Sequence, residues 1–353
     1  MEIKPDKFLE NLMATRAPTG CEYQATAAID AFAKPFADEY RRDVLGNRFA
    51  SVGSAQKTIM FAGHIDEIGL IISHIDDKGF LFFQQLGGHD NIMLSGRRVA
   101  ILTKKGVVRG VTGKKAIHLM DAKERKEVPE THQIWIDIGA SSKEEALSLV
   151  EIGDSAVFEC GLEHLSKNRY AARAFDDKAG AYCAFEALRR IKEKGGNPDF
   201  KITAVATSQE EIGTRGAWTA SYSVNPQIGV AIDVEHATDF PTVDNRKYGM
   251  IKLGAGVVIS RGPNINPVVF ERMVECAKAN NIPYQVNAEP RPTGTDARIL
   301  QMTRSGVATG LLGIPLRYMH TPAETADLQD IESCAALLAA FALSVKNDDD
   351  FTF

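Results

Sequence analysis

Acidic pairs and single histidines stand near the ends of several apolar runs in this sequence. In TAVATSQEEIGTRGA (203–217), small and β-branched residues lead to Glu210 and Glu211 and then to a turn that contains glycine. Neighbouring side chains of a strand point to opposite faces, so two adjacent carboxylates reach one site only where the backbone turns. This pair could begin a solvated loop, or it could supply two acidic groups with different chemical roles.

Similar residues occur in four other segments, which contain His64 and Asp66 (FAGHIDE), Asp176 (RAFDDKAG), Asp233 (IGVAIDV) and His320 (GIPLRYMH). Open α/β sheets bind ligands beyond the carboxyl ends of their strands, so we expect these side chains to meet there. Imidazole and carboxylate donors without thiolates are typical of catalytic zinc, cobalt or manganese. Two ions that share one aspartate would have enough ligands in His64, Asp176, Glu211, Asp233 and His320.

Glu210 is then left beside the metals and could accept a proton from the attacking water. Its neighbour Glu211 would hold an ion, and the turn would let both side chains face the site. Asp66 follows His64 by two residues and should share its side of the strand. It could therefore orient the imidazole, as ligating histidines usually require.

Each of these signals alone has an ordinary structural explanation. A single histidine at a strand end usually forms a hydrogen bond, and RAFDDKAG could be a helix start at which aspartates suit the helix dipole. Their joint occurrence at five segments favours a site. His236 stays open between a hydrogen bond within its loop and a contact with substrate.

The composition is that of a water-soluble globular protein. The 353 residues are 44% hydrophobic and 25% charged, with a formal net charge of −5. We expect no general attraction to nucleic acid or to an anionic membrane. Five dispersed cysteines without a CxxC pair, and an N-terminus unlike a signal peptide, predict reduced thiols in the cytoplasm. The most apolar stretch, 335–345, is too short to span a bilayer.

The pattern of elements changes twice along the chain. Strands and helices alternate in 1–67 and 165–353, which predicts one α/β domain. Residues 68–164 contain short β-like runs and one short helix at 141–150, as in a small barrel or sandwich inserted into that domain. We predict helices at 8–12, 25–33, 174–196, 266–281 and 335–345, and strands at 57–69, 200–208, 228–234 and 307–320.

Five motifs together resemble the M42 family of di-metal aminopeptidases, the glutamyl aminopeptidase and TET-type group. They are AGHIDEIG, RAFDDKAG, TSQEEIGTRGA, AIDVEHATDFP and RYMHTPAETADLQDIE. The resemblance covers nearly the whole chain. It implies a mixed-sheet α/β/α catalytic domain with a small inserted β-barrel or PDZ-like domain, through which members of the family form dimers. Those dimers commonly assemble into homododecamers.

The resemblance also implies a role for each candidate residue. Asp176 would bridge two divalent ions, zinc or cobalt with manganese as a possibility. His64 and Asp233 would complete one metal site, and Glu211 and His320 the other. Glu210 would be the general base, and Asp66 would support His64.

The function predicted from these residues is removal of N-terminal residues from short peptides. Two alternatives were weighed. One is an endoglucanase-like glycoside hydrolase that uses Glu210 and Asp233, and the other is a non-catalytic scaffold that retains metals. The preferred N-terminal residue stays open, although Arg261 or Arg291 could favour an acidic one.

Overall fold

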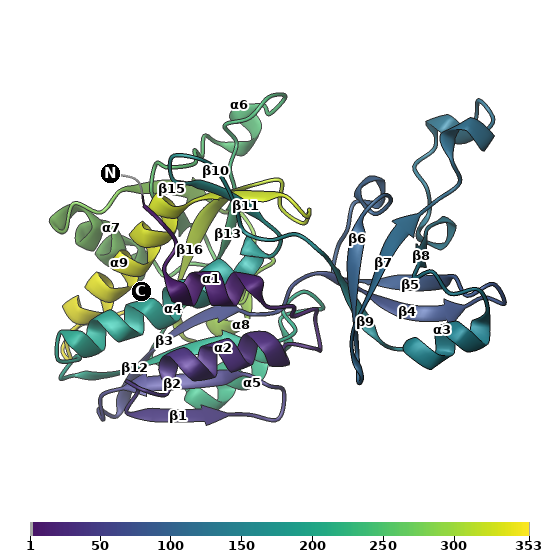
Figure 1. The fold of residues 1–353 in the computed structure, drawn as a ribbon. Helices are drawn as coiled ribbons and strands as arrows, with labels where there is room; N and C mark the ends of the chain where they lie inside the picture. Colours follow the sequence, from purple (N-terminus) through teal and green to yellow (C-terminus); the bar gives the residue numbers. More distant parts are fainter. Residues whose placement is uncertain (1–2, 353) are drawn as a thin grey trace.

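The computed structural model describes residues 3–352 and contains a mixed α/β body beside a smaller β-barrel (Figure 1). Eleven strands form the large sheet, in the order β1-β2-β12-β3-β13-β16-β17-β11-β10, and β14 and β15 attach beside β16. Their bounds are β1 Glu39–Arg42, β2 Arg48–Val52, β3 Lys57–His64, β10 Glu163–Ser166, β11 Arg169–Ala172, β12 Phe200–Thr207, β13 Ile228–His236, β14 Val257–Arg261, β15 Tyr284–Ala288, β16 Ala308–Arg317 and β17 Glu324–Asp327.

The four central strands of this sheet, β12, β3, β13 and β16, run parallel, and the flanking strands pair antiparallel, except that β15 runs parallel to β14. The sequence of β3, KTIMFAGH, is buried from its second residue to its last. Continuous burial of this kind is typical of a parallel strand that has a layer of helices on each face.

Alternate residues of β3 enter two different cores. Ile59 and Phe61 belong to the larger core, which includes residues of the helices α1, α2, α4, α7 and α9, whereas Met60 and Ala62 pack with α5 and α8. The helices in the described residues, apart from 3-10 turns and the barrel helix, are α1 Lys7–Ala14, α2 Tyr23–Ala33, α4 Phe175–Glu193, α5 Arg215–Val224, α6 Asn245–Tyr248, α7 Pro267–Ala279, α8 Ala297–Gln301 and α9 Leu328–Ser344.

The smaller unit is a closed barrel of six strands, in the order β4-β5-β8-β7-β6-β9. These are β4 Gly69–Ile75, β5 Leu81–Leu86, β6 Arg98–Thr103, β7 Gly106–Gly113, β8 Trp135–Asp137 and β9 Ser155–Phe158. Its helix α3, Lys143–Leu149, begins after Ser142, whose side chain accepts a hydrogen bond from the Glu145 N–H. Glu163 and His164, which fall inside the predicted insert 68–164, pair with β11 in the large sheet.

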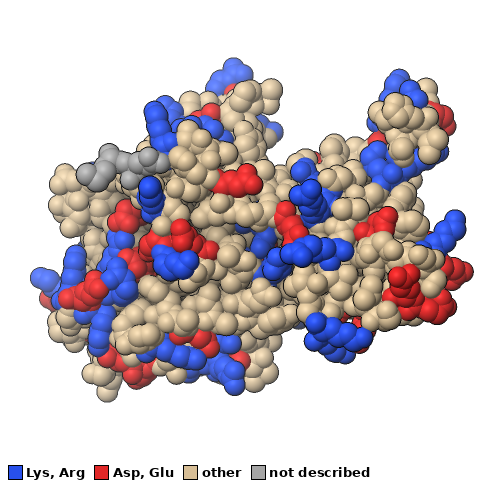
Figure 2. Space-filling model, viewed as in Figure 1, with Lys and Arg blue, Asp and Glu red and all other residues tan. Residues whose placement is uncertain are grey.

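The predicted fold class is confirmed: the chain forms an α/β domain with a mixed sheet, together with a closed β-barrel. The long predicted helices and strands are present, while several short elements, including β1, β14, β15 and α8, were not predicted. No helix among residues 3–352 combines the length and the apolar character that crossing a membrane requires. Figure 2 shows basic and acidic side chains interspersed over one face of the molecule.

A buried ionic cluster joins the N-terminal segment, the end of β3 and the start of α4. Glu67 accepts hydrogen bonds from Arg173, from Lys178 Nζ at 2.8 Å and from the Ala17 N–H at 2.8 Å. Both cations also donate to the carbonyl oxygen of Thr15. Burial would raise the pKa of Glu67, but the charges of Arg173 and Lys178 outweigh it and lower the pKa to about 2.

We therefore predict that Glu67→Gln lowers the free energy of unfolding by roughly 3–5 kcal/mol, because two cations stay buried without their counter-ion. The pKa of Glu67 lies below its ordinary value of 4.5, so the ionised side chain stabilises the fold above that pH. This contribution is lost as pH falls towards 2, and the difference between wild type and variant should shrink over the same range. Urea denaturation at several pH values measures both effects.

The exposed Glu10, which pairs with Lys7 at the surface, provides the control. Glu10→Gln should change stability by less than about 0.5 kcal/mol. Equal effects of the two substitutions would contradict the role assigned to the cluster.

Candidate active site

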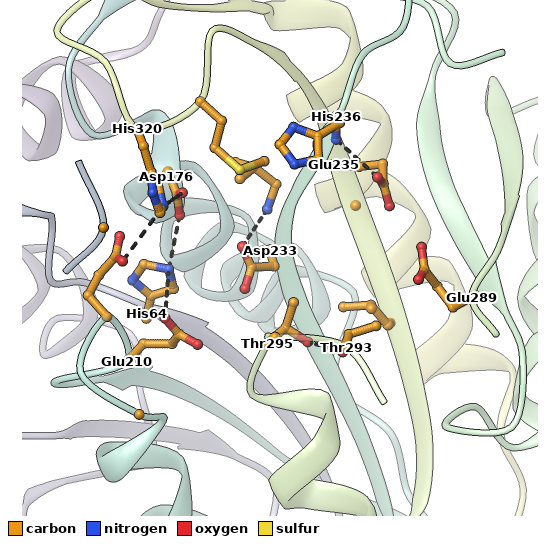
Figure 3. Close-up of a pocket in the computed structure, with 18 residues that line it drawn as sticks. His64, Asp176, Glu210, Asp233, Glu235, His236, Glu289, Thr293, Thr295 and His320 are labelled. Atoms are coloured by element: carbon orange, nitrogen blue, oxygen red, sulfur yellow. Dashed lines mark hydrogen bonds and ion pairs between the residues drawn. The ribbon is translucent and has the colours of Figure 1, made fainter. Parts of the chain in front are cut away.

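One cavity of about 470 Å³ lies where the carboxyl ends of the central parallel strands meet (Figure 3). Six of the seven side chains predicted to form the site line this cavity: His64, Asp176, Glu210, Glu211, Asp233 and His320. The seventh, Asp66, is fully buried behind His64. The structure therefore brings together residues that lie up to 256 positions apart in the chain.

The six cavity residues come from five different connections or strands. His64 ends β3, Asp176 lies in the first turn of α4, Glu210 and Glu211 occupy the turn between β12 and α5, and His320 follows β16 by three residues. Asp233 differs from the expectation that it ends its strand, because β13 continues to His236.

The position of Asp233 follows from the way the strands separate. β13 pairs with β3 only as far as Ala231, which lies opposite Ala62, although it continues beside β16. Beyond that pair the two strands are no longer hydrogen-bonded, and Asp233 lines the cavity there.

Close packing of α4 against β3 brings Asp176 to His64. A Cβ atom added to Gly63 would lie 2.5 Å from backbone atoms of Gly180 and Ala181 in α4, so only glycine permits this approach. At the end of the strand, the His64 N–H donates to Asp177 Oδ2 at 3.0 Å. The second aspartate of the pair thus ties the start of the helix to the strand.

The Asp176 carboxylate lies between two imidazoles. Its Oδ1 is 3.1 Å from His64 Nε2, and its Oδ2 is 3.2 Å from His320 Nε2. Glu211 Oε2 lies 3.7 Å from His320 Nε2, and Glu210 Oε2 lies 4.0 Å from His64 Nε2. Each oxygen of the Asp176 carboxylate thus faces a different histidine. Glu210 lies beside His64, and Glu211 lies beside His320.

Asp66 holds two parts of the site together. Its Oδ1 is 3.5 Å from His64 Nδ1, and its backbone carbonyl oxygen is 3.1 Å from the same nitrogen. The carboxylate also accepts hydrogen bonds from the backbone N–H groups of Glu210 at 3.0 Å and Glu211 at 3.2 Å. The strand itself ends at His64, so Asp66 reaches the imidazole from the following loop and not from the same strand face.

Glu324, which was not among the predicted site residues, supports the other end of the site. Its buried carboxylate accepts the N–H of Asp176 at 3.1 Å and the N–H of His320 at 3.0 Å. His320 has a φ of 61°, which is uncommon for a residue other than glycine. The only sequence signal for Glu324 is its place four residues after His320.

Burial perturbs the carboxyl groups of the cavity strongly. Burial, with the charges of Asp233 and Asp296, raises the pKa of Glu210 to about 9, although His64 opposes the shift. Burial also raises the pKa of Asp233 to about 7, and burial together with Asp176 raises the pKa of Glu211. Several carboxylates crowded away from water destabilise one another unless positive charge lies among them.

The donor set fits metal cations. Glu211 Oε1 is buried and has no hydrogen-bond partner among residues 3–352. Donor atoms of His64, Asp176 and Glu211 all lie within 4.8 Å of one another, as do those of His64, Asp177 and Asp233. Oxygen and imidazole nitrogen donors suit zinc, cobalt or manganese. Asp177 already accepts the His64 and Gly180 N–H groups, so we assign it a structural role.

The remaining sequence candidates lie around this centre. His236 lines the cavity, and its N–H donates to Glu235 at 3.0 Å. Thr293, Gly294 and Thr295, from the loop before α8, line it as well. Arg261 is exposed and stacks over the Phe270 ring at 5.1 Å, and neither Arg261 nor Arg291 lines the cavity.

Comparison with known proteins places this geometry in a family. The model of the M42 glutamyl aminopeptidase family matches residues 46–337. The lysyl aminopeptidase of Pyrococcus furiosus is 39% identical over 319 residues, which are 90% of this chain and 90% of that protein. A TET aminopeptidase from a marine sediment archaeon of the Thaumarchaeota has a TM-score of 0.91 at 32% identity, with 96% of both chains covered.

The TET1 peptidase of Pyrococcus horikoshii, solved as a dodecamer, has a TM-score of 0.86 at 31% identity, over 97% of this chain and 100% of that chain. The family match and both structural likenesses extend over the motifs that carry the cavity residues. This chain therefore belongs to the M42 glutamyl aminopeptidase family, and it is a peptidase of the aminopeptidase class.

Proposed function

We propose that this enzyme is a two-metal aminopeptidase that removes N-terminal residues from short peptides, with Glu210 as the general base. The observation that carries the proposal is the Asp176 carboxylate with one histidine on each oxygen, at 3.1 and 3.2 Å. A carboxylate that faces two separate donor groups is suited to bridge two cations.

His64 and Asp233 would complete one metal site with Asp176, and Glu211 and His320 would complete the other. Zinc or cobalt fits these donors, and manganese is also compatible with them. The chemistry that two bound cations supply is a water of lowered pKa and a polarised scissile carbonyl. Side chains of the protein carry out the proton transfer.

Glu210 is the acid–base group in this proposal. It lines the cavity 4.0 Å from His64, and its backbone is held by Asp66. Its carboxylate accepts the proton of the attacking water and then donates it to the nitrogen of the leaving amine. Burial raises the proton affinity of this carboxylate, which helps it to take up the proton of the water, and cations bound nearby would favour the ionised form that a base requires.

The two alternatives leave parts of the site without a role. A glycoside hydrolase built on Glu210 and Asp233 would not use the histidines on either side of Asp176. A structural metal site is usually closed by four protein ligands, whereas these residues line an open cavity.

We further propose a cytoplasmic enzyme that dimerises through the inserted barrel, residues 68–164, and assembles into a homododecamer. The support is the dodecameric Pyrococcus horikoshii relative and the exposed apolar side chains of Ile117, Leu119 and Val128 on the barrel insertion. Five free, dispersed cysteines support the location.

Glu210→Gln should lower kcat by about 100- to 10,000-fold, because the variant cannot take up the proton of the attacking water. Its metal content should match that of the wild type. Glu211→Gln should instead reduce metal content, because Glu211 is assigned to an ion. Steady-state assays and elemental analysis of both variants separate these roles, and near-normal turnover by Glu210→Gln would refute the assignment of the base.

The metal assignment predicts about two divalent ions per chain in the active enzyme. Chelation should abolish activity, and zinc or cobalt should restore it. Asp176→Asn should lose both ions, whereas His132→Ala, which changes an exposed histidine of the barrel, should keep them. Retention of two ions by Asp176→Asn would exclude the proposed bridge.

Asp66→Asn should weaken metal binding by about 10- to 100-fold, since the partners of ligating histidines contribute effects of that size. The substitution also replaces the carboxylate that accepts the Glu210 and Glu211 N–H groups with an amide. Asp77→Asn, on an exposed turn of the barrel, is the matched control. Isothermal titration with zinc compares the three proteins, and unchanged affinity in Asp66→Asn would argue against the supporting role.

A further inference from the structure

The cavity contains a second acidic group that the proposed mechanism does not use. Glu235, near the end of β13, and Glu289, directly after β15, line its wall on the side away from His64 (Figure 3). Both side chains are half-buried. The same two residues, with His236 and Met319, also line an adjoining cavity of about 820 Å³. The two carboxylates therefore stand where both cavities meet.

Neither carboxylate forms an ion pair with a lysine or arginine in the described part of the chain, although His236 lies beside them in both cavities and Lys247 lines the larger one. Within residues 3–352, no lysine or arginine lines the 470 Å³ cavity. Glu235 Oε1 accepts the His236 N–H at 3.0 Å, and Glu289 Oε1 accepts Asn287 Nδ2 at 2.8 Å. A carboxylate has about four acceptor positions, so both retain capacity for further donors.

Packing around Glu235 keeps its side chain in this place. Gly313 of β16, the register partner of Asp233, also lines the cavity, and a Cβ atom there would lie 2.7 Å from Glu235 Cβ. Glu235 and Glu289 line the walls of both cavities together, and burial with the charge of Glu235 raises the pKa of Glu289 although His236 opposes the shift. Two like charges are thus held near each other in a partly dry wall, an arrangement that a cation between them stabilises.

The catalytic end of the cavity also requires positive charge, which the proposed metal ions would supply. Glu211 Oε1 lines it, is buried and has no hydrogen-bond partner among the described residues. Cations and charged N–H donors are therefore the ligands that suit both ends of the cavity, the catalytic end and the end with Glu235 and Glu289. A volume of about 470 Å³ is within the range of small-molecule sites, about 300–1,000 Å³.

We propose that Glu235 and Glu289 form the subsite for the side chain of the N-terminal residue, and that this residue is lysine or arginine. The inference rests on the proposed function, since it assigns the substrate class of that active site. An ammonium or guanidinium group gains charge-assisted hydrogen bonds from the two carboxylates. A glutamyl side chain meets two like charges, and a leucyl side chain leaves both carboxylates partly desolvated without a partner.

The test uses the metal-loaded enzyme and four chromogenic substrates, the p-nitroanilides of lysine, arginine, leucine and glutamate. The wild type should show kcat/KM values for lysine and arginine at least about tenfold above that for leucine, with glutamate lowest. Glu289→Gln should lower the ratio of the lysyl to the leucyl kcat/KM by roughly 10- to 100-fold. Glu289→Lys should reverse the order of the lysyl and glutamyl substrates.

The matched control is Glu271→Gln, which removes the same charge from an exposed position of α7 and should leave the ratio unchanged. Thermal melting of all variants verifies that they are folded. A wild-type preference for leucine would mean that the larger cavity, with Phe240 and Tyr248, receives the side chain. That result would overturn this inference and leave the proposed function standing. So would a preference for glutamate, or an equal fall of the ratio in Glu271→Gln. Cleavage of none of the four substrates would overturn the proposed function as well.

Discussion

Repulsion among buried carboxylates is the interaction on which the rest of this structure depends. Asp176, Glu210, Glu211 and Asp233 lie together at the carboxyl ends of parallel strands, and burial raises the pKa values of the last three. A fold keeps such a group only if positive charge compensates it. Hydrogen bonds with His64 and His320 outweigh burial at Asp176 alone and hold its pKa below the usual range.

Backbone hydrogen bonds to other buried carboxylates hold this arrangement in place. Asp66 accepts the N–H groups of the Glu210–Glu211 turn, and Glu324 accepts those of Asp176 and His320. Glu67 ties the segment after β3 to the start of α4 through Arg173 and Lys178. The side chains that face the cavity are thus positioned by neighbours that do not face it.

The cavity has two acidic regions with different surroundings. Around Asp176 the carboxylates alternate with imidazoles, which is an arrangement of metal ligands. At Glu235 and Glu289 the carboxylates have amide donors only, which leaves them available to a diffusible cationic group. On our proposals, one polar cavity would bind metals at one end and select a substrate side chain at the other.

The sequence by itself determined the fold class, because apolar runs define strands, and it identified six side chains that line the cavity, because ligands bind beyond the carboxyl ends of parallel strands. Residues such as His64 and Glu211 could be chosen from their type and spacing. Only the tertiary structure decided the position of Asp233 within its strand, the support from Glu324 and the pairing of Glu235 with Glu289. These depend on where β13 separates from β3 and on how closely α4 packs at Gly63. Contacts between distant segments leave no periodic pattern in the sequence, because packing in three dimensions sets them.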